Sequence, residues 1–257
     1  MKKYFLLSII AILSFSCVDD EGGEIGGHGY RFFPRKVSYL FVLPLEQVIR
    51  YVPGLNGEVM QYTDYKIFRD DALSKNVFQL GISTSNCDLF SLEDPMLYNT
   101  ILDDHIPEIE RQLAQDYEKQ SKQKKSGSPG GLDAFNWIDI EYRTTPIRNL
   151  TISSLNTPLF GKAAGESLND FFDILGYGPS AIVSYPSNSL IYGNTSKEFP
   201  KAIDEWLSLY PYAQAGMRLA PNKAITGLPV DVQFVVRMET HEGLVLLDTT
   251  QMFTITE

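Results

Sequence analysis

The strongest constraint on the fold is a strict alternation of apolar and polar residues near the C-terminus. Between Val230 and Met238, valine, phenylalanine or methionine occupies every second position. A period of two matches a β-strand, whose successive side chains point to opposite faces. Turn residues follow and end at Gly243, and apolar residues then return from Leu244 to Ile255 around a polar interruption. We therefore predict an antiparallel terminal hairpin whose returning strand carries a bulge.

Similar short patterns occur earlier in the chain and predict further strands. They lie at 37–43, 60–67, 77–82, 138–142 and 147–152. With 257 residues, of which 44% are hydrophobic, the chain has material for one substantial core. We therefore expect an all-β fold, a single antiparallel β-sandwich over residues 30–257 of immunoglobulin-like or transthyretin-like type. A proline at position 44 is expected to end the strand that begins at Val37.

Helices are expected only as short insertions in this β-domain. Apolar residues recur at helical spacing within residues 94–131, between an Asp94-Pro95 start signal and a lysine-rich end followed by a Ser/Gly linker. Pro107 would kink this helix or divide it in two. Two shorter helices are predicted at 168–175 and 200–209.

The N-terminus predicts export and a lipid anchor. Residues 1–16 begin with Lys2 and Lys3 and continue with an apolar run that is too short to span a membrane. Cys17 follows Leu-Ser-Phe-Ser, which resembles the lipobox of bacterial lipoproteins, with the leucine one position further from the cysteine than is usual. Bacteroidetes-type lipoproteins tolerate this spacing. We expect lipidation of Cys17 after removal of residues 1–16; ordinary secretion is the alternative.

Residues 17–29 are expected to form a flexible tether, because glycines and acidic residues dominate them. The acidic cluster Asp19, Asp20 and Glu21 directly follows the lipidated cysteine. Such a cluster resembles the signal that sends Bacteroidetes-type lipoproteins to the outer face of the outer membrane. We therefore expect a lipid-anchored outer-membrane protein that faces outward, with incidental charge in a solvated tether as the alternative.

Charge and cysteine content argue against nucleic-acid binding and against an intramolecular disulfide. The formal net charge is −10, and removal of Lys2 and Lys3 with the signal makes it more negative. A nucleic-acid partner would be repelled, and the basic residues at 119–125 have no interleaved aromatic residues. Once Cys17 carries lipid, Cys87 has no partner for an intramolecular disulfide. We expect Cys87 to be a buried or half-buried thiol without a nearby base.

The sequence contains no catalytic motif that we can identify. It lacks the G-x-S-x-G of serine hydrolases. Asp103, Asp104 and His105, together with Glu108, are the best metal candidates, but the spacing of known zinc and calcium motifs is absent. We therefore expect no catalytic residue, no metal and no cofactor. A glycan hydrolase stays an alternative, because 32 acidic residues offer many possible pairs of carboxylates.

Aromatic residues are abundant, with 14 Tyr, 15 Phe and 2 Trp. An exposed ring can stack on the apolar face of a sugar. The candidate ligand platform consists of Trp137, Tyr177, Tyr185, Tyr192 and Tyr212. Tyr210 is a further candidate, whereas the helical spacing around Trp206 indicates a core residue.

Four segments carry a family resemblance. They are YTDYKI at 62–67, TISS at 151–154, GESLNDFF at 165–172 and the hairpin from Val232 to Ile255. Together they resemble an uncharacterised family of Bacteroides-type surface lipoproteins known only as a domain of unknown function. The similarity spans most of residues 30–257, and the helical stretch near 94–131 looks like an insertion. No activity or site comes with this resemblance.

We therefore expect a non-catalytic binding or structural module at the cell surface. Its ligand would be a glycan or another surface protein. The alternatives are a glycan-processing hydrolase and an envelope assembly or adhesion subunit. A hydrolase predicts a deep cleft with two carboxylates, a glycan-binding module predicts an exposed aromatic platform, and an assembly subunit predicts an uncovered edge strand or apolar patch.

Overall fold

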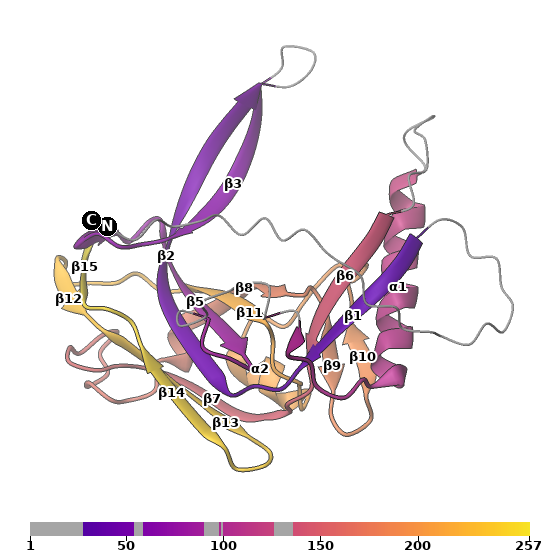
Figure 1. Cartoon of the computed structure of the whole chain (residues 1–257). Coiled ribbons are helices and arrows are strands. Elements are labelled where there is room, and N and C mark those ends of the chain that lie inside the picture. The colour runs from indigo at the N-terminus through magenta and orange to yellow at the C-terminus, as the bar shows by residue number, and fades with distance from the viewer. Residues whose placement is uncertain (1–27, 54–58, 90–97, 99, 126–135) are drawn as a thin grey trace, which may run out of the picture.

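The computed structural model describes residues 28–53, 59–89, 98, 100–125 and 136–257 (Figure 1). The fold is mostly β and contains several antiparallel sheets, which confirms the predicted all-β class. The predicted signal peptide, Cys17 and the acidic cluster at 19–21 lie outside the described residues. Within the described part of the chain, no helix combines the length and apolarity needed to cross a membrane.

The largest sheet has five strands in the order β3-β2-β5-β11-β8. These are β3 (Val59–Ile67), β2 (Tyr39–Pro53), β5 (Phe78–Ser85), β11 (Gly216–Pro221) and β8 (Phe172–Gly178). The prediction that Pro44 ends its strand is wrong, because β2 continues through it to residue 53. Pro44 lies where the pairing with β3 begins, and its carbonyl accepts the Phe68 N–H at 2.9 Å. At this end of the ladder the missing proline N–H is tolerated.

Two three-stranded sheets complete the main body. One has the order β14-β13-β7 and the other the order β12-β15-β4. The strands are β7 (Ile147–Ser154), β13 (Phe234–Thr240), β14 (Val245–Thr249), β12 (Val230–Val232), β15 (Phe253–Thr256) and β4 (Ala72–Ser74). The β13–β14 hairpin confirms the predicted terminal hairpin.

The prediction of one bulged returning strand is wrong, because the chain changes sheets there. β14 pairs with β13, whereas β15 pairs with β12 and β4. Buried Thr250 forms the corner: its N–H donates to the Phe234 carbonyl at 2.9 Å, and its hydroxyl accepts the Phe234 N–H at 3.0 Å. The polar interruption in the sequence is therefore a crossing between sheets.

The main core lies between these sheets. Phe78 of β5 stacks on Phe234 of β13 with ring centroids 5.5 Å apart, and Phe253 of β15 lies 5.6 Å from Phe78. All three rings are buried. Trp206 of helix α2 (Ile203–Ser208) is fully buried in the same cluster, as predicted. The five-stranded sheet and the two three-stranded sheets therefore share one apolar interior.

A smaller satellite layer packs beside this body (Figure 1). It contains β1 (His28–Arg35), β6 (Asn136–Arg143), α1 (Pro107–Lys125), β9 (Ile182–Ser184) and β10 (Ser189–Tyr192). Its own core joins Ile109 and Leu113 of α1 to Ile140 and Tyr142 of β6. The prediction of an antiparallel strand at 138–142 is wrong, because β6 pairs with β1 in parallel.

The helix predictions have mixed outcomes. α1 confirms the helical insertion, but it begins at Pro107, a position where the missing N–H costs no hydrogen bond. The start signal at Asp94-Pro95 lies outside the described residues. α2 confirms the predicted helix at 200–209, whereas the helix at 168–175 is wrong. Only one 3-10 turn, Asn169–Phe171, forms there, and β8 follows it because alternate residues from Phe172 onward enter the core.

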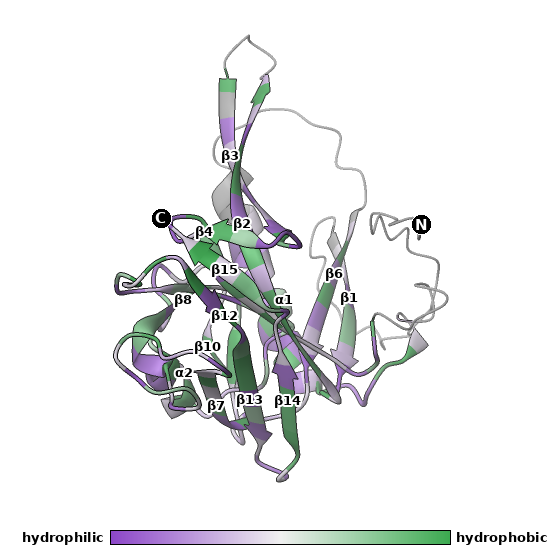
Figure 2. Ribbon diagram, turned by 90° about the vertical axis from the view of Figure 1, so that its left-hand side faces the viewer, coloured by the Kyte–Doolittle hydropathy of each residue, from purple (hydrophilic) through white to green (hydrophobic). Residues whose placement is uncertain are grey.

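The outer ends of β2 and β3 project from the body as a two-stranded hairpin (Figures 1 and 2). We call residues 45–53 and 59–67 the arm. Their pairing runs from Leu45 opposite Ile67 to Pro53 opposite Val59 without a register shift. The inner end of the arm still belongs to the large sheet, because Leu45 and Glu46 also pair with β5 and the Gln47 N–H donates to the Val77 carbonyl. Beyond Gln47, the arm carries a regular sheet edge away from the packed layers.

Candidate functional site

Three of the predicted platform residues are partly or wholly built into the fold. Tyr177 and Tyr212 are buried, and their hydroxyls donate to the Pro200 carbonyl and to Asn188 Oδ1, both at 2.7 Å. Burial raises the pKa of both tyrosines. Tyr192 packs on Phe199 with centroids 5.9 Å apart. Neither Tyr177 nor Tyr212 presents a ring face to a ligand.

The other two platform residues are exposed at different places. Trp137 lies on β6 and covers Gly29, where an added Cβ would come within 2.4 Å of the indole ring. Tyr185 and Tyr210 both contact His241. Their ring centroids lie 5.4 Å and 6.3 Å from the centroid of the imidazole ring. The two tyrosines tilt by 40° and 39° against that imidazole. Neither tyrosine ring is coplanar with the imidazole, so the three rings do not form one flat surface.

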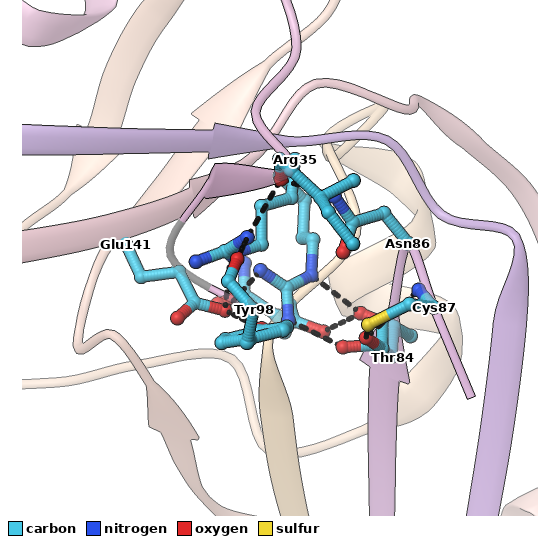
Figure 3. A network of polar contacts seen from close by, with 10 residues as sticks. Arg35, Thr84, Asn86, Cys87, Tyr98 and Glu141 are labelled. Atoms are coloured by element: carbon cyan, nitrogen blue, oxygen red, sulfur yellow. Dashed lines mark hydrogen bonds and ion pairs between the residues drawn. The ribbon is translucent and has the colours of Figure 1, made fainter. Parts of the chain in front are cut away.

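A buried polar network joins β1 and β6 to the end of β5 (Figure 3). Glu141 Oε1 accepts hydrogen bonds from the Tyr98 hydroxyl at 2.6 Å and from Arg143 Nη1 at 2.5 Å, and Arg35 Nε lies 3.5 Å away. Arg143 also donates to the hydroxyl and carbonyl of Thr84. Arg35 stacks on the Tyr98 ring at 3.5 Å and is fully buried. The network therefore fastens the satellite layer to the main sheet.

The charges of this network fix the protonation of its carboxylate. Burial acts to raise the pKa of Glu141, but Arg143, the Tyr98 hydroxyl and Arg35 together hold the pKa below its ordinary value. Burial also raises the pKa of Tyr98, which keeps its hydroxyl a donor. Glu141 is therefore an ionised anchor for two buried guanidinium groups.

Glu141 and Asp139 both line a cavity of about 290 Å³ beside this network. They are two residues apart on β6 and so lie on the same face of the strand. Asp139 is held by Arg31 at 2.6 Å, and Glu141 is ionised. A glycosidase acid must retain its proton near neutral pH. Glu141 is held ionised and Asp139 is paired with an arginine, so this pair does not supply the protonated acid.

The metal candidates are directed to other partners. Asp103 accepts a hydrogen bond from the Thr144 hydroxyl, and His105 Nδ1 lies 2.6 Å from Glu110. Asp103 and His105 precede α1, so they do not share a helical face with Glu108. Among the described residues, no three His, Cys, Asp or Glu side chains are grouped to hold a metal. Cys87 is half-buried, as predicted.

A second cavity, of about 540 Å³, follows the first residues of β2. Here, the backbone groups of alternate residues of β2 point away from β5. They have no partner in β3, because the pairing of β2 with β3 begins only at Leu45. The Val42 N–H of this edge donates to Asp248 Oδ2 at 2.6 Å. A carboxylate placed on an open strand edge blocks the pairing of another strand.

Two other sheet edges are also covered by the chain itself. Segment 200–202 covers β8, where the Ile174 N–H donates to the Lys201 carbonyl at 2.7 Å. Asn169 covers β7: its Oδ1 accepts the Ile152 N–H at 2.9 Å, and its Nδ2 donates to the Leu150 carbonyl at 2.8 Å. The fold therefore protects these edges with specific hydrogen bonds.

The outer edge of β3 has no comparable cover in the described part of the chain. β3 is the last strand of its sheet, and its odd-numbered residues direct their backbone groups away from β2. The Tyr65 N–H donates to Asp64 Oδ1 at 2.9 Å, within the strand itself. Val59, Gln61, Thr63 and Ile67 contribute backbone groups without a partner among the described residues.

One face of the arm carries several exposed apolar side chains, with Gln61 and Thr63 among them. The side chains of Ile49, Tyr51, Val59 and Ile67 share this face and are well exposed, Tyr51 at 66% and Val59 at 68%. The opposite face carries the ion pairs of Arg50 with Asp64 at 2.9 Å and of Lys66 with Glu46 at 2.8 Å. The arm therefore combines an open hydrogen-bonding edge with an exposed apolar surface. The strand predicted at 60–67 is confirmed as β3, but its hairpin with β2 was not predicted, although the turn-type residues PGLNG stand at 53–57 between the two strands.

Comparison of the chain with protein-family models, with curated proteins and with solved structures gives no significant match. The resemblance to surface lipoproteins therefore stays a prediction.

Proposed function

We propose that this protein is a non-catalytic, lipid-anchored subunit of the cell envelope that binds another protein chain through its arm. The observation that carries the proposal is the uncovered outer edge of β3, a regular strand of nine residues. Exposed, unprotected strand edges are templates for pairing with another chain. Specific hydrogen bonds protect the edges of β2, β7 and β8, whereas no described residue protects the outer edge of β3 in this way.

The energetics of the arm support the same proposal. An isolated two-stranded hairpin is marginally stable in water, and stability normally requires more strands or a covered apolar face. The arm also exposes several large apolar side chains that no described residue covers. A protein partner would add hydrogen bonds at the edge and remove apolar surface from water.

The alternative functions receive less support from the described residues. The carboxylates near the smaller cavity are engaged by arginines, which does not favour a glycan hydrolase. The exposed rings around His241 are tilted, which does not favour a flat sugar-binding platform. A role as an assembly or adhesion subunit would use the arm and the open edge of β3.

The anchor belongs to this proposal on sequence grounds. Lipidation at Cys17 and the cluster Asp19, Asp20 and Glu21 would place the domain on the outer face of the outer membrane, behind a glycine-rich tether. The facing antiparallel sheets support a β-sandwich. Its immunoglobulin-like or transthyretin-like topology and the resemblance to Bacteroides-type surface lipoproteins remain part of the proposal.

Site-specific photo-crosslinking in intact cells tests the proposed interface. A photoreactive amino acid replaces Val59 in the arm or, as a matched control, Leu247, which is 62% exposed on β14. We expect a protein adduct of defined mass from position 59 and none of that mass from position 247. Thr63→Pro, which removes an outward-facing N–H of β3, should abolish the adduct without lowering the amount of lipidated protein. Equal adducts from both positions, or none from position 59, would overturn the proposal.

A further inference from the structure

The proposed function leaves the partner open, and the inference that follows rests on that function. We propose that the partner strand is β3 of a second copy of this chain, paired antiparallel across a twofold axis at Thr63. The result is a continuous four-stranded ribbon in the order β2-β3-β3-β2. Self-pairing is favoured by the register, the side chains and the charge of the arm.

The register follows from which backbone groups are free. Phe68 donates to the Pro44 carbonyl, so even-numbered residues of β3 bond to β2 and odd-numbered residues face outward. An antiparallel copy can therefore exchange hydrogen bonds only between odd-numbered residues. Centring on Thr63 uses the whole strand: Val59 bonds to the partner's Ile67, Gln61 to the partner's Tyr65, and Thr63 to the partner's Thr63. For Tyr65 the N–H must exchange Asp64 for the new carbonyl.

The side chains are compatible with this register. An apolar pair, Val59 and the partner's Ile67, lies at each end of the ladder, and two threonines meet at its centre. On the opposite face, Asp64 lies across from the partner's Tyr62, so the two copies of Asp64 are not directly opposed. Cross-strand pairs of this kind stabilise a sheet, whereas directly opposed like charges destabilise it.

The charge of the arm also permits self-association. The whole chain has a formal net charge of −10, but residues 45–67 contain three acidic and two basic residues. Glu46 and Asp64 are neutralised in the arm by Lys66 and Arg50. Two copies can therefore meet at the arm with little of the repulsion that the rest of the chain would impose.

The twofold axis also places the apolar faces together. Because the axis is perpendicular to the ribbon, Ile49, Tyr51 and Val59 of both copies lie on one face. A four-stranded ribbon with one apolar face meets the requirement for stability that a two-stranded hairpin does not. In an isologous interface of this type, each contact occurs twice.

Cysteine crosslinking of the full-length, lipidated chain in its membrane tests this geometry. In a Cys87→Ser background, Thr63→Cys places two thiols on the axis, with Cα atoms about 5.5 Å apart, within disulfide range. Gln61→Cys places the same residue type about 14 Å from its own copy, because four residues along the strand separate them. We expect mild oxidation to give a covalent dimer at position 63 with at least tenfold higher yield than at position 61.

A second pair of variants measures association without a new thiol. Thr63→Pro removes an outward N–H that makes no bond to the described residues, whereas Thr63→Val keeps it. Native mass spectrometry in mild detergent should show dimers for the wild type and Thr63→Val, and monomers for Thr63→Pro. Equal dimer yields at positions 61 and 63, or dimers that persist in Thr63→Pro, would overturn the inference.

The two proposals fail separately. A photo-adduct at position 59 whose mass is twice that of this chain supports self-pairing. An adduct with a different protein, combined with no disulfide at position 63, would refute self-pairing and keep the proposed function. No adduct at position 59 together with monomers of the wild type would refute both.

Discussion

Replacement of Glu141 by glutamine should expose how much the buried arginine network contributes to stability. The amide keeps the shape of the side chain and one acceptor oxygen for Tyr98 and Arg143. It removes the negative charge that faces Arg143 and Arg35, of which the first is 4% exposed and the second 0%. Two guanidinium groups would then be buried without their anion.

The expected cost follows from the burial of the three partners. Breaking a buried ion pair by removing one partner typically costs about 3–5 kcal/mol. The Glu141 side chain is 32% exposed, so water screens part of its charge, and we expect about 2–3 kcal/mol. Arg148→Gln is the matched control, because it removes an exposed partner of Glu239 and should cost less than about 1 kcal/mol.

The pH dependence gives this prediction a distinctive signature. Since the folded protein lowers the pKa of Glu141, the carboxylate stabilises the fold above its ordinary pKa of 4.5. This contribution is lost as the pH falls through the lower pKa of the folded state. Denaturant unfolding of wild type and Glu141→Gln should therefore differ at pH 7 and converge as the pH falls below 4.5. A difference that stays constant down to pH 3, or one below about 1 kcal/mol at pH 7, would refute the reasoning.

Two further predictions concern the packing of Gly193 against helix α1 and the protection of the edge of β2 by Asp248. Gly193→Ala should destabilise the protein by about 1–3 kcal/mol in thermal or denaturant unfolding, because its Cβ would lie 2.5 Å from the buried carboxyl group of Asp116. Gly216→Ala, whose nearest contact is 3.9 Å, should cost less, and equal costs would contradict this account. Asp248→Ala removes the acceptor of the Val42 N–H and should cost about 1 kcal/mol while increasing aggregation, measured by light scattering. Unchanged aggregation would show that this carboxylate does not protect the edge.

Local patterns predicted those elements whose neighbours are close in sequence. The alternation from Val230 to Met238 indicated the terminal hairpin, and the spacing of Ile109 and Leu113 indicated the buried face of α1. These two elements were predicted correctly because the period of the apolar residues determines which side chains enter the core. The corner at Thr250 was misread as a bulge, because a polar interruption does not show which sheet the next strand joins.

Long-range pairing and surface exposure could not be predicted in the same way. β6 pairs with β1, more than one hundred residues earlier, and nothing in its alternation specifies a parallel partner. The arginine network likewise joins Arg35, Thr84 and Arg143, which only the tertiary fold brings together. In the arm, the sequence predicted the strand at 60–67, but neither its pairing with β2 nor the lack of cover on its outer edge among the described residues.

Amide hydrogen exchange of the arm tests the central claim most directly. Peptides covering residues 59–67 would be compared in native membranes and in dilute detergent, with Thr63→Pro as the control. If the arm binds another chain, the outward amides of Gln61 and Thr63 should exchange more slowly in the membranes of the wild type, and the variant should show no such protection. Identical, fast exchange of these amides in both states would show that the edge of β3 is unoccupied and would contradict the account.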